Sequence, residues 1–465
     1  MKTKIGLLIV LLLGYYAISF AQSYGGWQQI DSLNEARYNH SAIQLANGDV
    51  LVVGGAVLGD AKSCEIYNIN SNHWSEVART NYVRGNHRLI LLNSKRVLAV
   101  GSPVTKSCEI YDPDSNKWIL TDSLKIGRVS ASHQVVKLLD GRILVVGGYT
   151  RDYLDPERET LKMCEIYDEI TGKWSIADSM KAKRSSHSAT LLKDGRVLVA
   201  GGGISPNPLA SCEIYDPSIN KWSVTAPMNI AREHHNAVLL PSGKVLVIGG
   251  LANNNLILTK SCELYDPTQD KWEIVDSIQN SDAAQAAFII NDKDLLLIGT
   301  NYQQQLVWEI YDYIGFKSKC VNYLNGGSFV NNKIQLKDGK ILVSGGVRTP
   351  DYEVYLPIKK CWIFDKNLTH VTETKDRENN DIFFQNYPNP FNPTTKISFS
   401  LQQKSQIKLK VFDVLGREIQ ILADGVYEAG KHEVEFNATN LPSGVYFYNL
   451  TTGSNSITKK MLLLR

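Results

Sequence analysis

The sequence predicts an all-β protein with two domains, a seven-bladed β-propeller followed by a small β-sandwich. Three observations support this prediction. A Cys-Glu-Ile-Tyr phrase returns at intervals of 44 to 56 residues, a period typical of propellers and repeat arrays. Each interval contains short apolar runs separated by turn residues. The end of the chain, about 80 residues, has a different pattern of short alternating strands.

The repeated phrase defines seven units, whose first positions are Cys64, Cys108, Cys164, Cys212, Cys262, Trp308 and Cys361. In five of them a Trp follows the Tyr by seven residues. The fourth unit shows four expected strands most clearly, at residues 187–192, 196–200, 211–215 and 221–224. Asp194-Gly195 predicts a tight hairpin between the first two strands, and Gly201-Gly202 predicts an end to the second where backbones crowd or φ is positive.

Two units depart from this pattern. Gly101-Ser102 and Gly299-Thr300 replace the glycine pair in the second and sixth units, and Cys320 stands near the expected Trp of the sixth. We therefore expect these two blades to be less regular than the others.

A glycine pair, a Tyr and a spaced Trp in one repeat resemble the kelch motif. The resemblance covers roughly residues 26–371, within a domain expected at residues 22–371. It implies four-stranded blades that pack between two neighbours and bury both faces. Because propellers host many unrelated activities, the resemblance is specific for the fold and not for the function.

The seventh unit lacks a Trp-bearing fourth strand after Phe364. Residues 26–32 (GWQQIDS) resemble residues 173–179 (KWSIADS) of the third unit. The sequence therefore predicts that Trp27 completes the seventh blade and closes the ring, which removes free strand edges.

The blade cysteines are expected to be free thiols, although cysteines in an exported protein ordinarily suggest disulfides. Each one belongs to a different blade, and packed sheets lie about 10 Å apart. A disulfide needs Cα atoms within roughly 7 Å.

The first 21 residues read as a signal peptide. Lys2 and Lys4 form a positive end, residues 5–13 are apolar, and Ser19-Phe20-Ala21 is a small-x-small cleavage site. No later segment is long and apolar enough to predict a membrane span. The formal net charge is +3, and removal of the two lysines leaves +1. A chain with so small a net charge lacks the excess of positive charge that is typical of nucleic-acid-binding proteins.

The composition changes at residues 372–384, which we read as a polar linker. Residues 385–465 predict a small immunoglobulin-like β-sandwich. They resemble the C-terminal sorting domain of the type IX secretion system of Gram-negative bacteria. The motif residues that carry the resemblance are Tyr387, Pro388, Asn389, Pro390, Phe391, Gly444, Val445, Tyr446, Lys459 and Lys460. The resemblance implies that the secretion machinery is a partner and that the product is released or held on the cell surface.

A histidine recurs eight residues before the hairpin position, at His40, His87, His133, His187 and His235. These residues could ring a metal, or each could hydrogen-bond a neighbouring loop; their repetition at one position of the motif favours the structural role, and blades 6 and 7 have Gln285 and Asn331 there. Arg37, Arg84, Arg184 and Arg232 precede four of them by three residues and are expected to pair with the blade glutamates, which would otherwise be buried without a partner.

The blade topology predicts which face binds a ligand. The loop entering the first strand and the loop joining strands two and three lie on the same face, and the longest insertions are there. Tyr and Arg are frequent anchors of recognition sites. The candidate binding residues are Tyr149, Arg151, Tyr153, Arg158, Arg348, Tyr352, His187 and His235.

No motif for a nucleophile, a phosphate-binding loop or a metal site occurs in the sequence, so we assign no catalytic residue and no cofactor. The leading hypothesis is a secreted module that binds a protein or a carbohydrate. The alternative is a carbohydrate-active kelch enzyme, similar to sialic-acid epimerases or to galactose oxidase. A purely structural surface protein is a third reading.

Overall fold

The computed structural model describes residues 25–55, 61–101, 105–128, 132–150, 159–204, 207–252, 257–280, 285–300, 306–324, 332–348, 356–368, 384–401, 404–413, 417–452 and 455–464. The predicted signal peptide and most of the predicted linker lie outside these residues. The chain forms two compact units that divide between Thr374 and Lys375. All regular structure in the described residues is β-strand.

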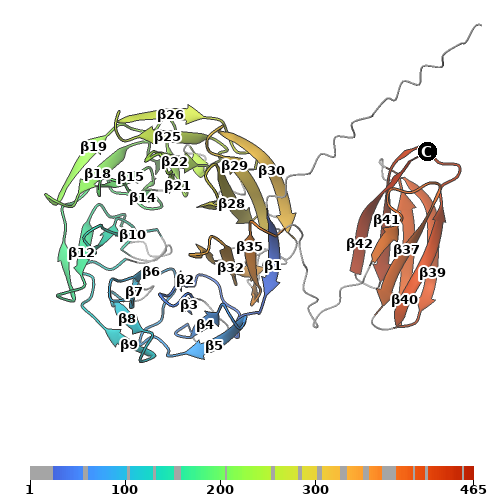
Figure 1. Cartoon of the computed structure of the whole chain (residues 1–465), viewed down its shortest axis with the longest axis horizontal. Helices are drawn as coiled ribbons and strands as arrows, with labels where there is room; N and C mark the ends of the chain where they lie inside the picture. Colours follow the sequence, from blue (N-terminus) through green and yellow to red (C-terminus); the bar gives the residue numbers. More distant parts are fainter. Residues whose placement is uncertain are drawn as a thin grey trace, which may run out of the picture. The chain divides into compact units, whose positions relative to one another are not determined.

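Seven four-stranded antiparallel sheets make up the first unit and surround a common axis (Figure 1). Blade 1 holds β2 (Ser41–Gln44), β3 (Val50–Val53), β4 (Cys64–Asn68) and β5 (His73–Val77). Blade 2 holds β6 (Arg88–Leu91), β7 (Val97–Val100), β8 (Glu109–Asp112) and β9 (Lys117–Leu120). Blade 3 holds β10 (Gln134–Lys137), β11 (Ile143–Val146), β12 (Cys164–Asp168) and β13 (Lys173–Ile176). Blade 4 holds β14 (Ser188–Leu191), β15 (Val197–Ala200), β18 (Cys212–Asp216) and β19 (Lys221–Thr225).

The remaining three blades complete the ring. Blade 5 holds β21 (Asn236–Leu239), β22 (Val245–Ile248), β25 (Cys262–Asp266) and β26 (Lys271–Val275). Blade 6 holds β27 (Ala286–Ile289), β28 (Asp294–Thr300), β29 (Leu306–Asp312) and β30 (Lys317–Leu324). Blade 7 holds β31 (Asn332–Gln335), β32 (Ile341–Ser344), β35 (Cys361–Asp365) and β1 (Gly26–Ile30). The predicted number of blades is confirmed.

The ring closes through β1, which pairs with β35 in the register Trp27 opposite Phe364. The prediction that Trp27 completes the last blade is therefore confirmed. Its side chain is fully buried in the hydrophobic cluster between blades 6 and 7.

The repeated aromatic residues hold neighbouring blades together. In blade 5 the Trp272 ring lies 4.9 Å from the Tyr265 ring on the adjacent strand, and its indole nitrogen donates a hydrogen bond to Ala226 O of the connection from blade 4. Trp74, Trp118 and Trp222 make the equivalent hydrogen bond to the preceding connection. The indole rings thus fill the space between blades, as the kelch resemblance implies.

The seven cysteines are all free thiols. The six in the repeated phrase are buried, and burial raises the pKa of Cys164 and Cys212 to about 12. The prediction of free thiols is confirmed, and these side chains act as small apolar core residues.

Blade 6 is irregular because nothing ends its second strand at the usual place. β28 runs on through Gly299 and Thr300, where other blades have the glycine pair, and β29 and β30 lengthen with it. The register between β29 and β30 shifts at Ile310 and Tyr311. The prediction of an irregular sixth blade is therefore confirmed, whereas blade 2 keeps four regular strands.

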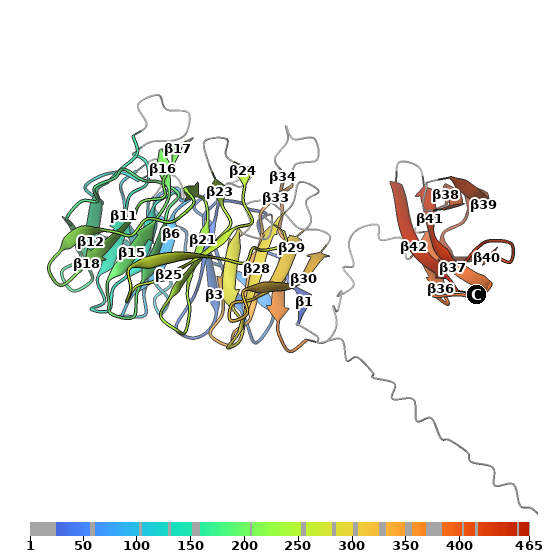
Figure 2. The same cartoon turned by 90° about the horizontal axis from the view of Figure 1, so that it is seen from above.

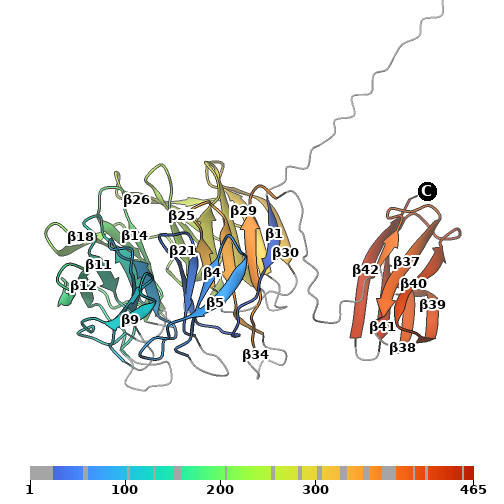
Figure 3. The ribbon, with the colours of Figure 1, turned by 60° about the horizontal axis from the view of Figure 1, so that its bottom comes forward.

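The second unit is a sandwich of two antiparallel sheets (Figure 3). One sheet holds β36 (Phe384–Tyr387), β37 (Thr394–Leu401) and β40 (Gly430–Asn437). The other holds β39 (Glu418–Tyr427), β38 (Ser405–Phe412), β41 (Gly444–Thr452) and β42 (Asn455–Leu463). Alternate residues of both sheets, such as Ile397, Phe436, Leu409 and Leu450, form one buried core.

Candidate functional site

One face of the propeller carries the loops that enter the inner strands and the loops that join strands two and three of each blade; we call it the loop face. Three short ladders stand on it (Figure 2). The first ladder pairs β16 (Gly203–Ile204) with β17 (Asn207–Pro208). The second has β23 (Leu251–Ala252) in the middle, with β20 (Arg232–Glu233) on one side and β24 (Ile257–Leu258) on the other. The third pairs β33 (Val347–Arg348) with β34 (Leu356–Pro357).

A buried ion pair fixes the loop face in each of five blades. In blade 5, Arg232 Nη2 lies 2.8 Å from Glu263 Oε1, and both side chains are fully buried. Arg232 Nη1 also donates to the carbonyls of Gly249 and Ser261. Glu263 accepts hydrogen bonds from the backbone N–H groups of Asn229 and Ile230. The pair thereby joins the entering loop, the end of β22 and the start of β25.

The expected pairing of Arg and Glu is confirmed in the other blades that have it: Arg37 with Glu65, Arg84 with Glu109 and Arg184 with Glu213. The sequence analysis missed a fifth pair, Arg128 with Glu165 in blade 3. Arg128 precedes the blade histidine by five residues instead of three, so it is out of step with the repeat. The sequence did contain a signal for this pair. Glu165 is a repeated blade glutamate, but its blade has no arginine three residues before the histidine, so a partner at another position could have been sought.

His40, His187 and His235 each lie between the glycine pairs of two successive blades. A Cβ on Gly147 of blade 3 would come within 2.8 Å of His187 Cε1, and a Cβ on Gly202 of blade 4 within 2.6 Å of His187 Cβ. Both glycines have positive φ, 55° and 71°. Any other residue would therefore clash as well as strain the backbone. The absence of a side chain at these glycines thus leaves room for the histidine.

The histidines are buried. Burial lowers the pKa of His40 and His235 to about 3, with the positive charges of Arg37 and Arg232 acting in the same direction. Two of them bond neighbouring hydroxyl groups, His40 with Ser344 and His235 with Ser188, each at 2.9 Å. These two contacts are consistent with a structural role for the repeat, which stays a prediction. Among the described residues, no group of His, Cys, Asp and Glu is arranged to hold a metal ion.

A ring of hydrogen bonds, not foreseen from the sequence, links the blades next to these histidines. The residue after the histidine donates to the carbonyl of the next blade's histidine, from Ser41 to His87 and from Gln134 to His187. Arg88 makes the same bond to His133 O. Since the donor residue differs in type from blade to blade, the sequence repeat does not predict these hydrogen bonds.

The predicted binding residues divide into three groups. His187, His235 and Tyr149 are 1%, 8% and 6% exposed, so they support the loop face from within. Arg348 lies in β33 next to Val347, which pairs with Pro357. Arg151, Tyr153, Arg158 and Tyr352 lie outside the described residues. Their assignment as ligand contacts stays a prediction.

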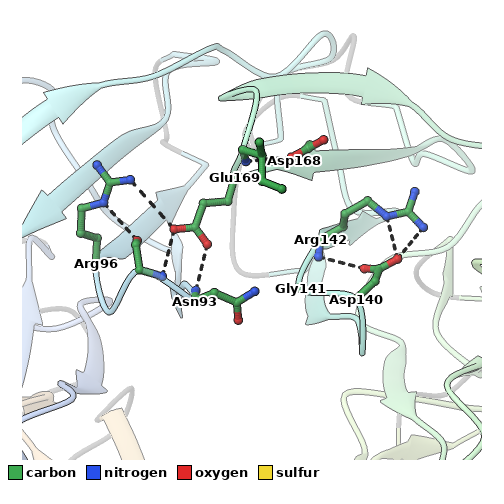
Figure 4. A pocket seen from close by; sticks show the side chains of 9 residues that line it. Asn93, Arg96, Asp140, Gly141, Arg142, Asp168 and Glu169 are labelled. Atoms are coloured by element: carbon green, nitrogen blue, oxygen red, sulfur yellow. Dashed lines mark hydrogen bonds and ion pairs between the residues drawn. The ribbon is translucent and has the colours of Figure 1, made fainter.

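A depression of about 600 Å³ lies on the opposite face, between the inner hairpins of blades 2 and 3 and the outer turn of blade 3 (Figure 4). Its lining is Asn93, Ser94, Arg96, Asp140, Gly141, Arg142, Asp168, Glu169 and Ile170. Nothing in the repeat pattern predicted it.

Four of the five charged residues that line this depression form two ion pairs. Glu169 accepts hydrogen bonds from the backbone N–H groups of Asn93 and Ser94 and lies 4.0 Å from Arg96. Arg142 pairs with Asp140 at 2.7 Å. Glu169 replaces the proline found at this position in blades 2, 4 and 5 and acts as a clamp between two blades. The fifth charged residue, Asp168, accepts hydrogen bonds from the backbone N–H groups of Ile170 and Thr171, so the lining carries one net negative charge.

The motif residues of the second unit converge on its last strand. Asn389 Oδ1 accepts a hydrogen bond from Leu462 N, while Phe391 N donates to Leu462 O and Leu464 N donates to Phe391 O. Phe391 is 2% exposed and lies in the sandwich core. The opening motif therefore fastens β42 at its end.

The other motif segments lie on the same pair of strands. Gly444, Val445 and Tyr446 of β41 stand opposite Leu463, Leu462 and Met461 of β42. Further along, Lys459 and Lys460 stand opposite Tyr448 and Phe447, with Lys459 exposed. Tyr446 donates its hydroxyl proton to Pro442 O at 2.9 Å. Tyr387 belongs to β36, at the other sheet.

Comparison with family models identifies both units. Residues 135–181, 184–229 and 234–278 match the model of the kelch motif. Residues 385–464 match the model described as a secretion system C-terminal sorting domain. The chain thus combines kelch repeats with a type IX sorting domain, which marks it as a secreted, cell-surface or extracellular protein.

Among solved structures, a fungal alcohol oxidase of the AA5 family, in complex with copper, aligns over 95% of this chain and 100% of its own, with 12% identity and a TM-score of 0.41. A likeness of this size supports no statement about activity. No curated protein matches the chain. In the described residues, no helix has the length and hydropathy that a membrane span requires.

Proposed function

We propose that this protein is an extracellular recognition module, in which the propeller binds a protein or carbohydrate ligand on its loop face and the C-terminal domain directs export. The observation that carries the proposal is the construction of that face. Five buried Arg–Glu pairs fix the bases of its loops, and loops on a rigid scaffold commonly carry function.

The ligand-contacting part of the proposal concerns the insertions of blades 3 and 7, with Arg151, Tyr153, Arg158, Arg348 and Tyr352 as the contact residues. Tyr149, His187 and His235 are buried beneath them. Tyrosine and arginine are enriched among the residues that contribute most to binding energy at interfaces. The signal peptide at residues 1–21 supplies the first export step and the sorting domain the second.

An array of glycans and surface proteins, probed with the purified mature chain, tests the proposal. We expect a ligand whose affinity falls about tenfold or more in Tyr153→Ser and Tyr352→Ser variants. Arg142→Ala on the opposite face is the matched control and should bind normally. Equal binding by both loop variants, or loss in the Arg142 variant instead, would contradict the assignment of the loop face. Chemical conversion of an array sugar would replace it with the enzyme reading.

A further inference from the structure

One buried acid on the loop face has no partner. Glu233 belongs to β20, at the edge of the ladder that also holds β23 and β24 (Figure 2). The residue is 1% exposed, and its Oε2 atom has no hydrogen-bond partner. No cation within the described residues pairs with its carboxyl group. Because buried polar atoms in proteins are nearly always paired, this one requires an explanation.

Every other buried acid among the described residues is compensated. Five of them face a buried arginine: Glu65, Glu109, Glu165, Glu213 and Glu263. Glu309 accepts hydrogen bonds from two backbone N–H groups, and Asp294 pairs with Lys319. Glu233 is therefore the exception, and a buried carboxylate without a partner is costly.

The fold does not need an acid at this position. In blade 4 the residue two places before the histidine is Ser185, and its hydroxyl group donates to Gly203 O at 2.9 Å in the neighbouring ladder. An ionised carboxylate has no proton to donate in this way. Glu233 thus lacks a hydrogen bond that the serine of blade 4 makes, so stability alone does not explain its presence.

The charged groups beside Glu233 do not balance it. Arg232, the preceding residue, projects to the other side of the strand and pairs with Glu263 at 2.8 Å. Desolvation lowers the pKa of His234 more than the Glu233 carboxylate raises it, so the imidazole is mostly neutral at pH 7. The missing positive charge must therefore come from outside the chain.

The residues opposite Glu233 across the ladder are leucines. Glu233 stands opposite Leu251, and Leu251 stands opposite Leu258. Residues directly opposite one another in neighbouring strands project from the same face, so the carboxyl group and both leucines share one face of the ladder. Leu258 is 40% exposed. An apolar row that leads from solvent to a carboxyl group matches a cation on an aliphatic stem, such as a lysine side chain.

We propose that Glu233 binds a lysine side chain of a protein ligand, with the ammonium group at the carboxylate and the aliphatic stem along Leu251 and Leu258. Hydrogen bonds between an ammonium group and a carboxylate are charge-assisted and stronger than neutral ones. Because Glu233 is buried, the ligand must displace a neighbouring side chain. His234 lies at the surface beside it and can turn aside. The site rests on the proposed recognition function of the loop face and narrows the ligand to a protein.

Calorimetric titration of the mature chain with Nα-acetyl-lysine amide tests the proposal. We expect saturable binding that Glu233→Gln weakens about tenfold or more, because the substitution removes the charge and keeps the shape. Glu273→Gln, which removes an exposed acid from the outer strand β26, is the matched control and should leave the affinity unchanged. Nα-acetyl-norleucine amide, which has a similar stem without the ammonium group, should bind at least tenfold more weakly than the lysine amide.

A second measurement needs no ligand. Glu233→Gln removes a buried charge without a partner, so its thermal unfolding midpoint should be no lower than that of the unchanged chain. Glu263→Gln, which breaks a buried ion pair, should lower the midpoint. Equal lowering in the two variants would show that Glu233 has a structural partner and would count against the site.

Four results would overturn the proposal: no saturable binding of the lysine amide, equal binding of the norleucine amide, unchanged affinity in Glu233→Gln, or tighter binding of glucosamine, which would assign the ammonium group to an amino sugar. The recognition function is tested separately by the array. An array ligand that depends on Tyr153 and not on Glu233 would leave that function standing and refute this site. Binding of the lysine amide at Glu233 with no array ligand would support the site alone.

Discussion

The indole ring of Trp27 packs edge-on against the ring of Phe364, with centroids 5.4 Å apart and planes at 61°. The two residues come from opposite ends of the propeller sequence. Their strands, β1 and β35, pair over five residues, so the N-terminal segment supplies the strand that the last repeat lacks. The ring is therefore closed by hydrogen bonds as well as by packing, and no blade keeps an incomplete sheet.

Trp27→Ala should lower the free energy of unfolding by about 3–5 kcal/mol, the usual cost of removing a large buried aromatic side chain. The loss is one of packing, because the indole nitrogen has no hydrogen-bond partner among the described residues. Denaturant unfolding measures it. Gln28→Ala, one residue along the same strand, is the control and should cost less than about 1 kcal/mol. Equal effects of the two substitutions would mean that β1 does not close the ring in solution.

Arg232→Met should destabilise the protein by about 3–5 kcal/mol, because it leaves the Glu263 carboxylate buried without a counter-charge. The double variant Arg232→Met/Glu263→Gln should be more stable than the sum of the single effects predicts, and the difference measures the coupling of the pair. Arg196→Met breaks an exposed pair with Asp194, 37% and 48% exposed, and should cost under about 1 kcal/mol. Similar costs for Arg232→Met and Arg196→Met would show that the buried pair does not hold the loop face.

Much of the architecture could be predicted because the repeated phrase occurs seven times in the sequence. The glycine pairs, the aromatic residues and the Arg–Glu pairs each recur in phase, so one recognised unit predicts the others. Trp27 could be placed for the same reason, by its likeness to another unit.

The features that sequence reasoning missed have no such repetition. Arg128 is displaced by two residues within its loop, yet reaches the same glutamate position. The hydrogen-bond ring at the axis uses Ser41, Arg88 and Gln134, which share a place in the ladder and not a side-chain type. Only the strand pairing reveals these positions.

Acid should destabilise the propeller through its repeated histidines. Burial holds the pKa of His40 and His235 at about 3 and those of His87 and His187 well below the ordinary value of 6.5. Below pH 6.5 these histidines bind protons in the unfolded chain but not in the folded chain. The stabilisation is therefore complete above pH 6.5 and is lost progressively as the pH falls toward 3.

Urea unfolding between pH 7.5 and 5 checks this, since most carboxylates stay ionised over that interval. Each buried histidine can remove up to about 2 kcal/mol by pH 5. His187→Gln removes one of these histidines. It should therefore reduce the slope of the unfolding free energy against pH by about 1.4 kcal/mol per pH unit below 6.5. A flat stability profile down to pH 5 would mean that the imidazoles are not buried as neutral groups.

The C-terminal domain should govern destination and contribute nothing to the stability of the propeller. None of the described core residues of the propeller clusters lies beyond Phe364, and none of those in the sandwich core lies before Phe391. A variant lacking residues 385–465 should therefore unfold at the midpoint of the propeller in the mature chain, and it should accumulate in the periplasm. Calorimetry and cell fractionation measure the two effects separately. Phe391→Ala offers a milder comparison, since it removes a core side chain whose backbone fastens β42 and should impair export without changing the propeller transition. Surface delivery of the truncated chain would overturn the sorting role, and a lowered propeller midpoint would show that the two domains stabilise each other.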